Sequence, residues 1–142
     1  MSSILTIDTN IWAYYFDKEA PEHRHVERPV DRAIRSDQIS VNTVIVMELS
    51  HFLIKNLGPV QGGEKLSKFL SFPLTIEDLD YAMTLESIEQ LKRYSHLGVS
   101  GRDATILAFM KRSSSRKIMT HDSALKKVDW LEVLDPVPEK ET

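Results

Sequence analysis

The sequence of 142 residues contains no cysteine. This absence excludes disulfide bonds, zinc sites built from thiolates and a cysteine nucleophile, and it is consistent with a reducing compartment. Any metal site in this chain must therefore use oxygen or imidazole ligands.

Long apolar runs are also missing. No stretch approaches the roughly 18 consecutive apolar residues that suggest a membrane span. The N-terminal residues show no basic segment followed by an apolar stretch and a cleavage site. We therefore expect a cytoplasmic protein with no membrane contact.

A strong excess of one charge is lacking as well. The net charge is −3, with 42% hydrophobic and 27% charged residues, which is typical of an ordinary globular protein. Binding to a polyanion would therefore require a local basic face. Basic residues are concentrated in one stretch, and they are Arg102, Lys111, Arg112, Arg116, Lys117, Lys126 and Lys127.

Short apolar segments alternate with amphipathic segments along the chain, with no repeat, low-complexity stretch or linker. This alternation predicts a three-layer α/β/α sandwich around a central, mainly parallel sheet of four to five strands. We expect one domain over residues 1–135 and a polar tail over 136–142. The expected strands begin at Ile4 and cover residues 38–41, 73–76, 116–120 and 130–134.

Turn residues and capping patterns locate the intervening helices. Gly58-Pro59 is expected to end a helix that spans residues 44–56, and Gly62-Gly63 to add a flexible point. Thr75-Ile-Glu-Asp78 has the spacing of a capping box and predicts a helix running to about Tyr94.

Four acidic residues stand at positions where each has two possible roles. Asp8 ends the first strand, where it can start a turn or point into the crevice beyond the sheet. Glu48 interrupts an apolar helix, either as a salt-bridged side chain or as a functional carboxylate. Asp103 forms a capping box with Ser100, and Asp122 can cap a short helix.

Taken together, these acids can converge at the carboxyl edge of a parallel sheet. Like charges about 4 Å apart repel by on the order of 4 kcal/mol at an effective dielectric of 20, and a divalent cation would remove that repulsion. Oxygen ligands suit Mg²⁺ or Mn²⁺, and such a site can activate water to hydrolyse a phosphodiester. The chain has no P-loop, nucleophile elbow or dinucleotide fingerprint to indicate other chemistry.

Four short motifs, in this order and spacing, resemble the PIN domain family, and within it the VapC-like toxins of toxin–antitoxin pairs. The resemblance covers residues 4–134. The motifs are Ile-Asp-Thr-Asn at 7–10, Val-Met-Glu-Leu at 46–49, Arg-Asp-Ala-Thr-Ile-Leu-Ala at 102–108 and Met-Thr-His-Asp at 119–122.

The resemblance implies a Mg²⁺- or Mn²⁺-dependent ribonuclease that cleaves RNA, with a small antitoxin as partner and a homodimeric assembly. It carries the catalytic and metal-binding roles over to Asp8, Glu48, Asp103 and Asp122. Asn10 and Thr120 match polar neighbours that would orient these acids by hydrogen bonds.

Arg102, next to Asp103, is the best candidate in the basic stretch for contacting an RNA phosphate.

Other classes of function remain open. The chain can be a PIN-like RNA-processing nuclease outside a toxin–antitoxin system, or a non-catalytic module that binds RNA or assembles with proteins. A phosphatase of the haloacid-dehalogenase type needs a second acid two residues after its nucleophile, and here that position is Asn10.

Overall fold

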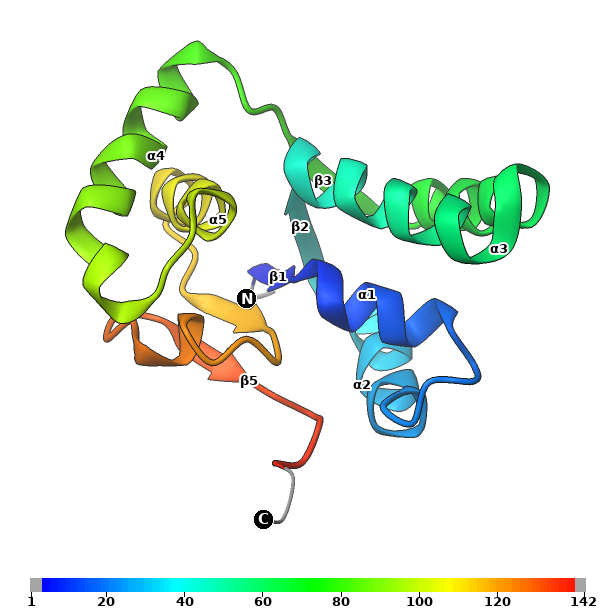
Figure 1. The fold of residues 1–142 in the computed structure, drawn as a ribbon. Coiled ribbons are helices and arrows are strands. Elements are labelled where there is room, and N and C mark those ends of the chain that lie inside the picture. Colours follow the sequence, from blue (N-terminus) through cyan, green and yellow to red (C-terminus); the bar gives the residue numbers. More distant parts are fainter. Residues whose placement is uncertain (1–3, 140–142) are drawn as a thin grey trace.

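The computed structural model describes residues 4–139, in which five strands form one sheet (Figure 1). Every neighbouring pair of strands is parallel, and the order across the sheet is β3-β2-β1-β4-β5. The strands are β1 (Ile4–Ile7), β2 (Gln38–Asn42), β3 (Leu74–Glu77), β4 (Lys117–Met119) and β5 (Glu132–Leu134). The predicted parallel α/β fold is confirmed.

Helices cover both faces of this sheet. In Figure 1, α1, α2 and α3 lie on one side and α4 and α5 on the other, as right-handed connections between parallel strands require. The helices are α1 (Thr9–Phe16), α2 (His23–Ser36), α3 (Thr43–Ser71), α4 (Tyr81–Tyr94) and α5 (Gly101–Arg112), with short 3-10 turns at η1 (Ser95–Leu97) and η2 (Leu125–Lys127).

The strand order places a crevice between β1 and β4. From β1 the chain proceeds to β2 and β3 across one half of the sheet, whereas β4 and β5 build the other half. Open α/β sheets bind ligands where the strand order reverses in this way, beyond the carboxyl ends of the strands. Because Ile7 pairs with Met119, the residues that follow β1 and β4 emerge side by side at this edge.

The core is formed by apolar side chains from the sheet and from both helical layers. Leu5, Ile7 and Ile118 are buried in the central strands, and Trp12 packs edge-on against Phe69 with ring centroids 4.8 Å apart. The Trp12 indole N–H donates to the Ile7 carbonyl at 3.0 Å, so its polar atom is satisfied within the core. This contact fixes α1 directly after β1.

The long helix α3 corrects one expectation. Gly58 and Pro59 do not end the helix but bend it, with Gly58 at φ 83° joining two helical arms. Gly62 is not a flexible point either, since a Cβ there would lie 2.6 Å from the Leu53 carbonyl oxygen. The second arm turns back against the first, and only glycine permits this close approach.

The start of α4 corrects another expectation. Thr75 and Glu77 belong to β3, so the capping box expected from Thr75 to Asp78 does not form. The helix begins at Tyr81 instead, where the Asp80 side chain accepts a hydrogen bond from the Met83 N–H at 2.8 Å. The strand propensity of this segment and its place in the sheet outweigh the local capping pattern.

Residues beyond β5 begin the predicted tail. Val137 is buried, and its N–H donates to the Asp135 carboxylate at 3.0 Å. The end of that tail, residues 140–142, and the first three residues of the predicted domain lie outside the described range. None of the helices within residues 4–139 is long and apolar enough to span a membrane.

Candidate active site at the carboxyl edge of the sheet

Asp8 is fully buried at the end of β1. One carboxylate oxygen accepts a hydrogen bond from the Thr9 N–H at 2.7 Å and thereby caps α1, and the other accepts one from the Thr120 hydroxyl at 2.8 Å. Burial raises the pKa of Asp8, while the Arg102 guanidinium and the hydrogen bonds from Thr120 and Thr9 oppose that rise. Asp8 therefore starts α1 and also joins the ends of β1 and β4 through Thr120.

Arg102 lies in the middle of the acids. Its guanidinium binds Asp8, contacts Glu48 Oε1 through Nε at 2.5 Å, and contacts Asp103 Oδ1 through Nη1 at 2.5 Å. Burial lowers the pKa of Arg102, but the charges of Asp8, Glu48 and Asp103 outweigh burial and raise it above its ordinary value. One permanent cation therefore joins three acids that come from three different elements.

Glu48 and Asp103 reach this point from two helices. Glu48 lies on the second turn of α3, with its side chain 36% exposed, and also accepts a hydrogen bond from the Thr9 hydroxyl at 2.9 Å. Asp103 stands in the first turn of α5, where its carboxylate accepts the Ser100 N–H at 3.2 Å and Ser100 caps the helix in return. The predicted capping box is confirmed, and it orients the carboxylate that binds Arg102.

Asp122 follows β4 at the same edge. Its N–H donates to the Thr120 hydroxyl oxygen at 3.0 Å, and its carboxylate accepts the Ala124 N–H at 3.0 Å. Burial raises the pKa of Asp122, and the charges of Asp103 and Asp8 raise it further, against the opposing hydrogen bond from Ala124. Asp122 is therefore electrostatically part of the same group as Asp103 and Asp8.

The two polar residues expected to orient the acids behave differently. Thr120 bridges Asp8 and the backbone of Asp122. Asn10 instead accepts the His121 N–H at 3.4 Å, and within residues 4–139 its side chain makes no hydrogen bond to any of the four acids. Asn10 thus holds the loop after β4 rather than a carboxylate.

Thr9 was not singled out as a site residue from the sequence. Its hydroxyl donates to Glu48, which joins the start of α1 to α3. The only signal was its position between Asp8 and Asn10, in a run of polar residues directly after a buried strand. That position indicates a helix start as readily as a site.

Most of the basic stretch is engaged elsewhere. Lys126 pairs with Asp135 at 2.5 Å, Arg112 with Glu86 at 3.1 Å, and Lys111 lies over the Trp130 ring, 5.5 Å from its centroid. The Arg102 guanidinium is itself held by acids. As arranged here, the stretch does not present one continuous basic face.

The four carboxylates have the chemistry that a divalent cation prefers, although they are not arranged around a metal position in this structure. Across residues 4–139, no three carboxylates or imidazoles are grouped closely enough to hold a metal ion as they stand. A cation nevertheless already lies among the acids, namely the Arg102 guanidinium. It supplies one positive charge to three carboxylates, and a divalent ion would satisfy this oxygen-rich set more fully.

The match to known families agrees with this geometry. The model of the PIN domain family matches residues 5–131. The chain belongs to the PIN domain family. PIN domains are typically metal-dependent nucleases, whereas among curated proteins none matches this chain.

Solved structures share the PIN fold at low sequence identity. VapBC2 of Rickettsia felis, bound to a DNA fragment from its promoter, has a TM-score of 0.72 at 20% identity over 93% of this chain and 98% of that one. VapC20 of Mycobacterium tuberculosis, a toxin that cleaves the sarcin-ricin loop, has a TM-score of 0.73 at 17% identity over 87% and 95% of the two chains.

FitAcB of Neisseria gonorrhoeae is similar at a TM-score of 0.64 and 18% identity, over 93% and 97% of the two chains. At these identities the likeness establishes the fold. The structural neighbours include VapC toxins of VapBC systems.

Proposed function

We propose that this PIN domain is a divalent-metal-dependent endoribonuclease that hydrolyses RNA phosphodiesters and acts as the toxin of a toxin–antitoxin pair. The observation that carries the proposal is the convergence of acids from β1, α3, α5 and the loop after β4 at the crevice between β1 and β4. Glu48, Asp103 and Asp122 lie 40, 95 and 114 residues after Asp8 in the sequence, so local capping alone does not explain why they meet.

Asp8, Glu48, Asp103 and Asp122 are the residues that would hold Mg²⁺ or Mn²⁺. When bound, the ion would supply a Lewis acid that lowers the pKa of a water molecule and neutralises charge at the phosphorus centre. Thr120 keeps the Asp8 carboxylate in place by hydrogen bonding, and Thr9 does the same for Glu48. The capping box of α5 orients Asp103.

Arg102 has to leave at least part of this cluster before the acids can bind a metal ion. Its guanidinium would then lie beside the acids, where it can contact an RNA phosphate through charge-assisted hydrogen bonds. The role of Arg102 in substrate binding therefore depends on its displacement. The same side chain would serve the metal-free state by neutralising the acids.

Purified protein and its Asp8→Asn variant, assayed on structured RNA with Mg²⁺, Mn²⁺ or EDTA, test the proposal. We expect the substitution to lower the cleavage rate at least about 100-fold, because even the outer partners of a metal site contribute about 10- to 100-fold. Circular dichroism of the variant should show an unchanged fold. Cleavage that survives the substitution or the chelator would contradict the mechanism.

An antitoxin is the proposed protein partner, in a complex that covers the acids. The support comes from structural neighbours whose names describe complexes of toxin with antitoxin. A homodimer is proposed on the same family resemblance. Co-expression with the product of an adjacent gene for a short DNA-binding protein, followed by size-exclusion chromatography with light scattering, tests both assemblies.

The binding of Arg102 by the acids favours one alternative function. Because Arg102 already binds three of the acids, a PIN domain that binds RNA or proteins without catalysis would need no metal. Calorimetric titration with Mn²⁺ distinguishes the metal-dependent nuclease from the non-catalytic module. A catalytic site should bind the ion and, at 100 times its dissociation constant, gain about 2.7 kcal/mol of stability. A flat titration would favour the binding module.

A further inference from the structure

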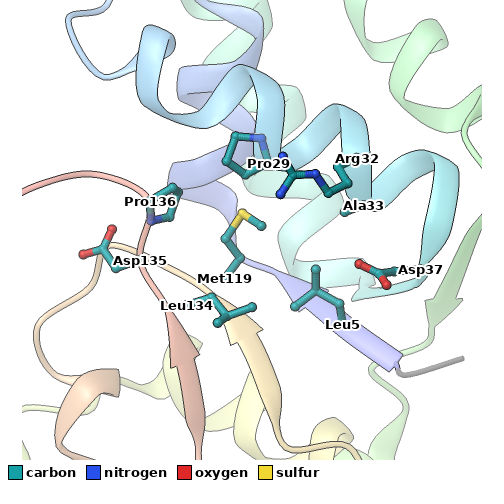
Figure 2. A pocket seen from close by; sticks show the side chains of 9 residues that line it. All are labelled: Leu5, Pro29, Arg32, Ala33, Asp37, Met119, Leu134, Asp135 and Pro136. Carbon is teal, nitrogen blue, oxygen red and sulfur yellow. The ribbon is translucent and has the colours of Figure 1, made fainter.

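Two hollows are lined in part by residues at the ends of β4 and β5 or just after them. The first lies between α2 and the sheet, with Leu5, Met119 and Leu134 forming its floor (Figure 2). The second has a volume of about 220 Å³ and is lined on one side by His121. His121 stands between Thr120 and Asp122 in the chain, so one residue that lines this second hollow belongs to the loop that carries Asp122.

The His121 ring is held in a fixed orientation. Its Nδ1 lies 2.8 Å from Asp135 Oδ2, its N–H donates to Asn10, and its ring meets Tyr14 edge-on at 66° with centroids 6.4 Å apart. Within residues 4–139, Nε2 of this ring has no hydrogen-bond partner. The His121 ring, which lines the hollow, is therefore already oriented and keeps Nε2 without a partner.

Other residues that line the hollow come from the start of α2. Arg24 and His25 both line the hollow, and Arg24 Nε donates to His25 Nε2 at 3.3 Å. Val137 and Pro138 add apolar surface. Unstacked nucleobases bind to protein by stacking on imidazole and guanidinium planes of this kind.

Glu22 supplies a polar group of a different kind. It lines the same hollow, and its carboxylate makes no hydrogen bond or ion pair within the described chain. A carboxylate repels phosphate but accepts hydrogen bonds from N–H groups at the edge of a base. Guanine is the RNA base with an N1–H and an N2 amino group side by side, which match the two oxygens of one carboxylate.

We propose that this hollow is a nucleobase subsite that selects a guanine next to the scissile phosphate. The proposal rests on the proposed ribonuclease function and adds the sequence preference of the same site. Pockets for drug-sized ligands measure about 300 to 1,000 Å³, so a smaller hollow suits one flat base. The base would stack between His121 and the Arg24–His25 pair, with its donor edge at Glu22.

Nucleotide binding tests the subsite without any cleavage. The imidazole resonances of His25 and His121 are followed by NMR during titration with 5′-GMP, 5′-UMP or ribose 5-phosphate, in EDTA. We expect 5′-GMP to shift both rings and to bind at least tenfold more tightly than the other two probes, because only guanine offers the paired donors. The Glu22→Gln variant should lose most of that preference, since its amide has one acceptor oxygen and must place its NH₂ donor against either N1–H or the N2 amino group.

His25→Ala should weaken 5′-GMP binding, whereas His51→Ala, which removes an exposed histidine from α3, should leave it unchanged. Equal binding of 5′-GMP and ribose 5-phosphate would overturn the subsite, because it would show recognition of phosphate alone. Changes in NMR chemical shift at other residues, with none at His25 and His121, would overturn it as well.

Cleavage of a randomised RNA pool by wild type, Glu22→Gln and His51→Ala gives the second readout. We expect guanine enrichment at one fixed position beside the cut in the wild type and in His51→Ala, and its loss in Glu22→Gln. Cleavage with no base preference near the cut would overturn the subsite while leaving the ribonuclease proposal intact. If the wild type does not cleave RNA, the ribonuclease proposal fails and the 5′-GMP titration alone decides on the hollow.

Discussion

Two clusters of charged side chains lie at the carboxyl edge of this sheet. Acids outnumber basic side chains in one of them, and basic side chains outnumber acids in the other. In the Arg102 cluster, one guanidinium binds Asp8, Glu48 and Asp103, with Asp122 close by. In the Asp135 cluster, one carboxylate binds both His121 at 2.8 Å and Lys126 at 2.5 Å. The Arg102 cluster has fewer basic side chains than acids, whereas the Asp135 cluster has two basic side chains for one acid.

The pKa shifts follow this difference. Burial raises the pKa values of Asp8 and Asp122, and neighbouring acids add to the rise at Asp122. Burial also acts on Asp135, but hydrogen bonds from Lys126 and His121 outweigh it and lower the pKa. A lowered value marks an ion pair that serves stability, whereas raised values mark an acidic set that would gain from a further cation.

Removing Arg102 should increase the difference in charge balance between the two clusters more than any other single substitution. We expect Arg102→Gln to lower the free energy of unfolding of the metal-free protein by about 3 to 5 kcal/mol, because it leaves buried carboxylates without their cation. Mn²⁺ should then stabilise the variant more than the wild type, since the ion no longer competes with the guanidinium. Urea unfolding in EDTA and in Mn²⁺ measures both effects.

Arg112→Gln is the matched control, because Arg112 forms an exposed pair with Glu86. Its effect should stay within about 1 kcal/mol in both buffers. Equal stabilisation of Arg102→Gln and wild type by Mn²⁺ would show that Arg102 and the ion do not share a site.

Asp135→Asn should break the balanced cluster. We expect a loss of about 1.5 to 3 kcal/mol at pH 7, the range for hydrogen bonds to charged groups. Because the folded-state pKa lies below the ordinary value of 3.8, the contribution of Asp135 is present above pH 3.8 and is lost as pH falls through the folded pKa. Urea unfolding of both proteins between pH 7 and pH 3 measures the difference, which should shrink toward acid. A constant difference over that range would contradict the assigned ion pairs.

Thr120→Val tests the hydroxyl that joins two acids of the Arg102 cluster. The valine keeps the shape of the side chain but cannot bond Asp8 or the Asp122 N–H. We expect a 10- to 100-fold loss in Mn²⁺ affinity or cleavage rate, as for other partners that orient metal ligands. Calorimetry and RNA cleavage measure it, with Thr84→Val in α4 as control. An unchanged affinity and rate would show that Thr120 acts only in folding.

Much of the architecture could be predicted from the sequence because its signals are local. The apolar segments at Ile4 and Gln38 became strands, and Ser100 with Asp103 formed the expected capping box. The start of α4 was placed wrongly, since Thr75 and Glu77 satisfy a capping pattern yet lie in β3. Pairing with β2 decided that segment, and such pairing is not visible in a capping motif.

The candidate site shows the same limit more clearly. Asp8, Asp103 and Asp122 could be located at strand ends or helix starts and Glu48 inside an apolar helix, and their meeting follows from a parallel sheet. That Arg102 would turn toward the acids rather than solvent could not be read from its position beside Asp103. Its orientation depends on the Glu48 carboxylate, 54 residues earlier in the chain. The metal-binding and catalytic roles of these residues stay predictions.

The position of β4 beside β1 has a consequence for synthesis of the chain. Asp8 directly follows β1, yet the Thr120 hydroxyl that binds this carboxylate, just after the neighbouring strand β4, is translated 112 residues later. Chains grow from the N-terminus, and long-range parallel pairing forms slowly. A ribosome-bound fragment that ends before residue 117 therefore lacks one wall of the crevice. Whatever chemistry this edge performs, the nascent protein cannot perform it before β4 and Thr120 have left the ribosome.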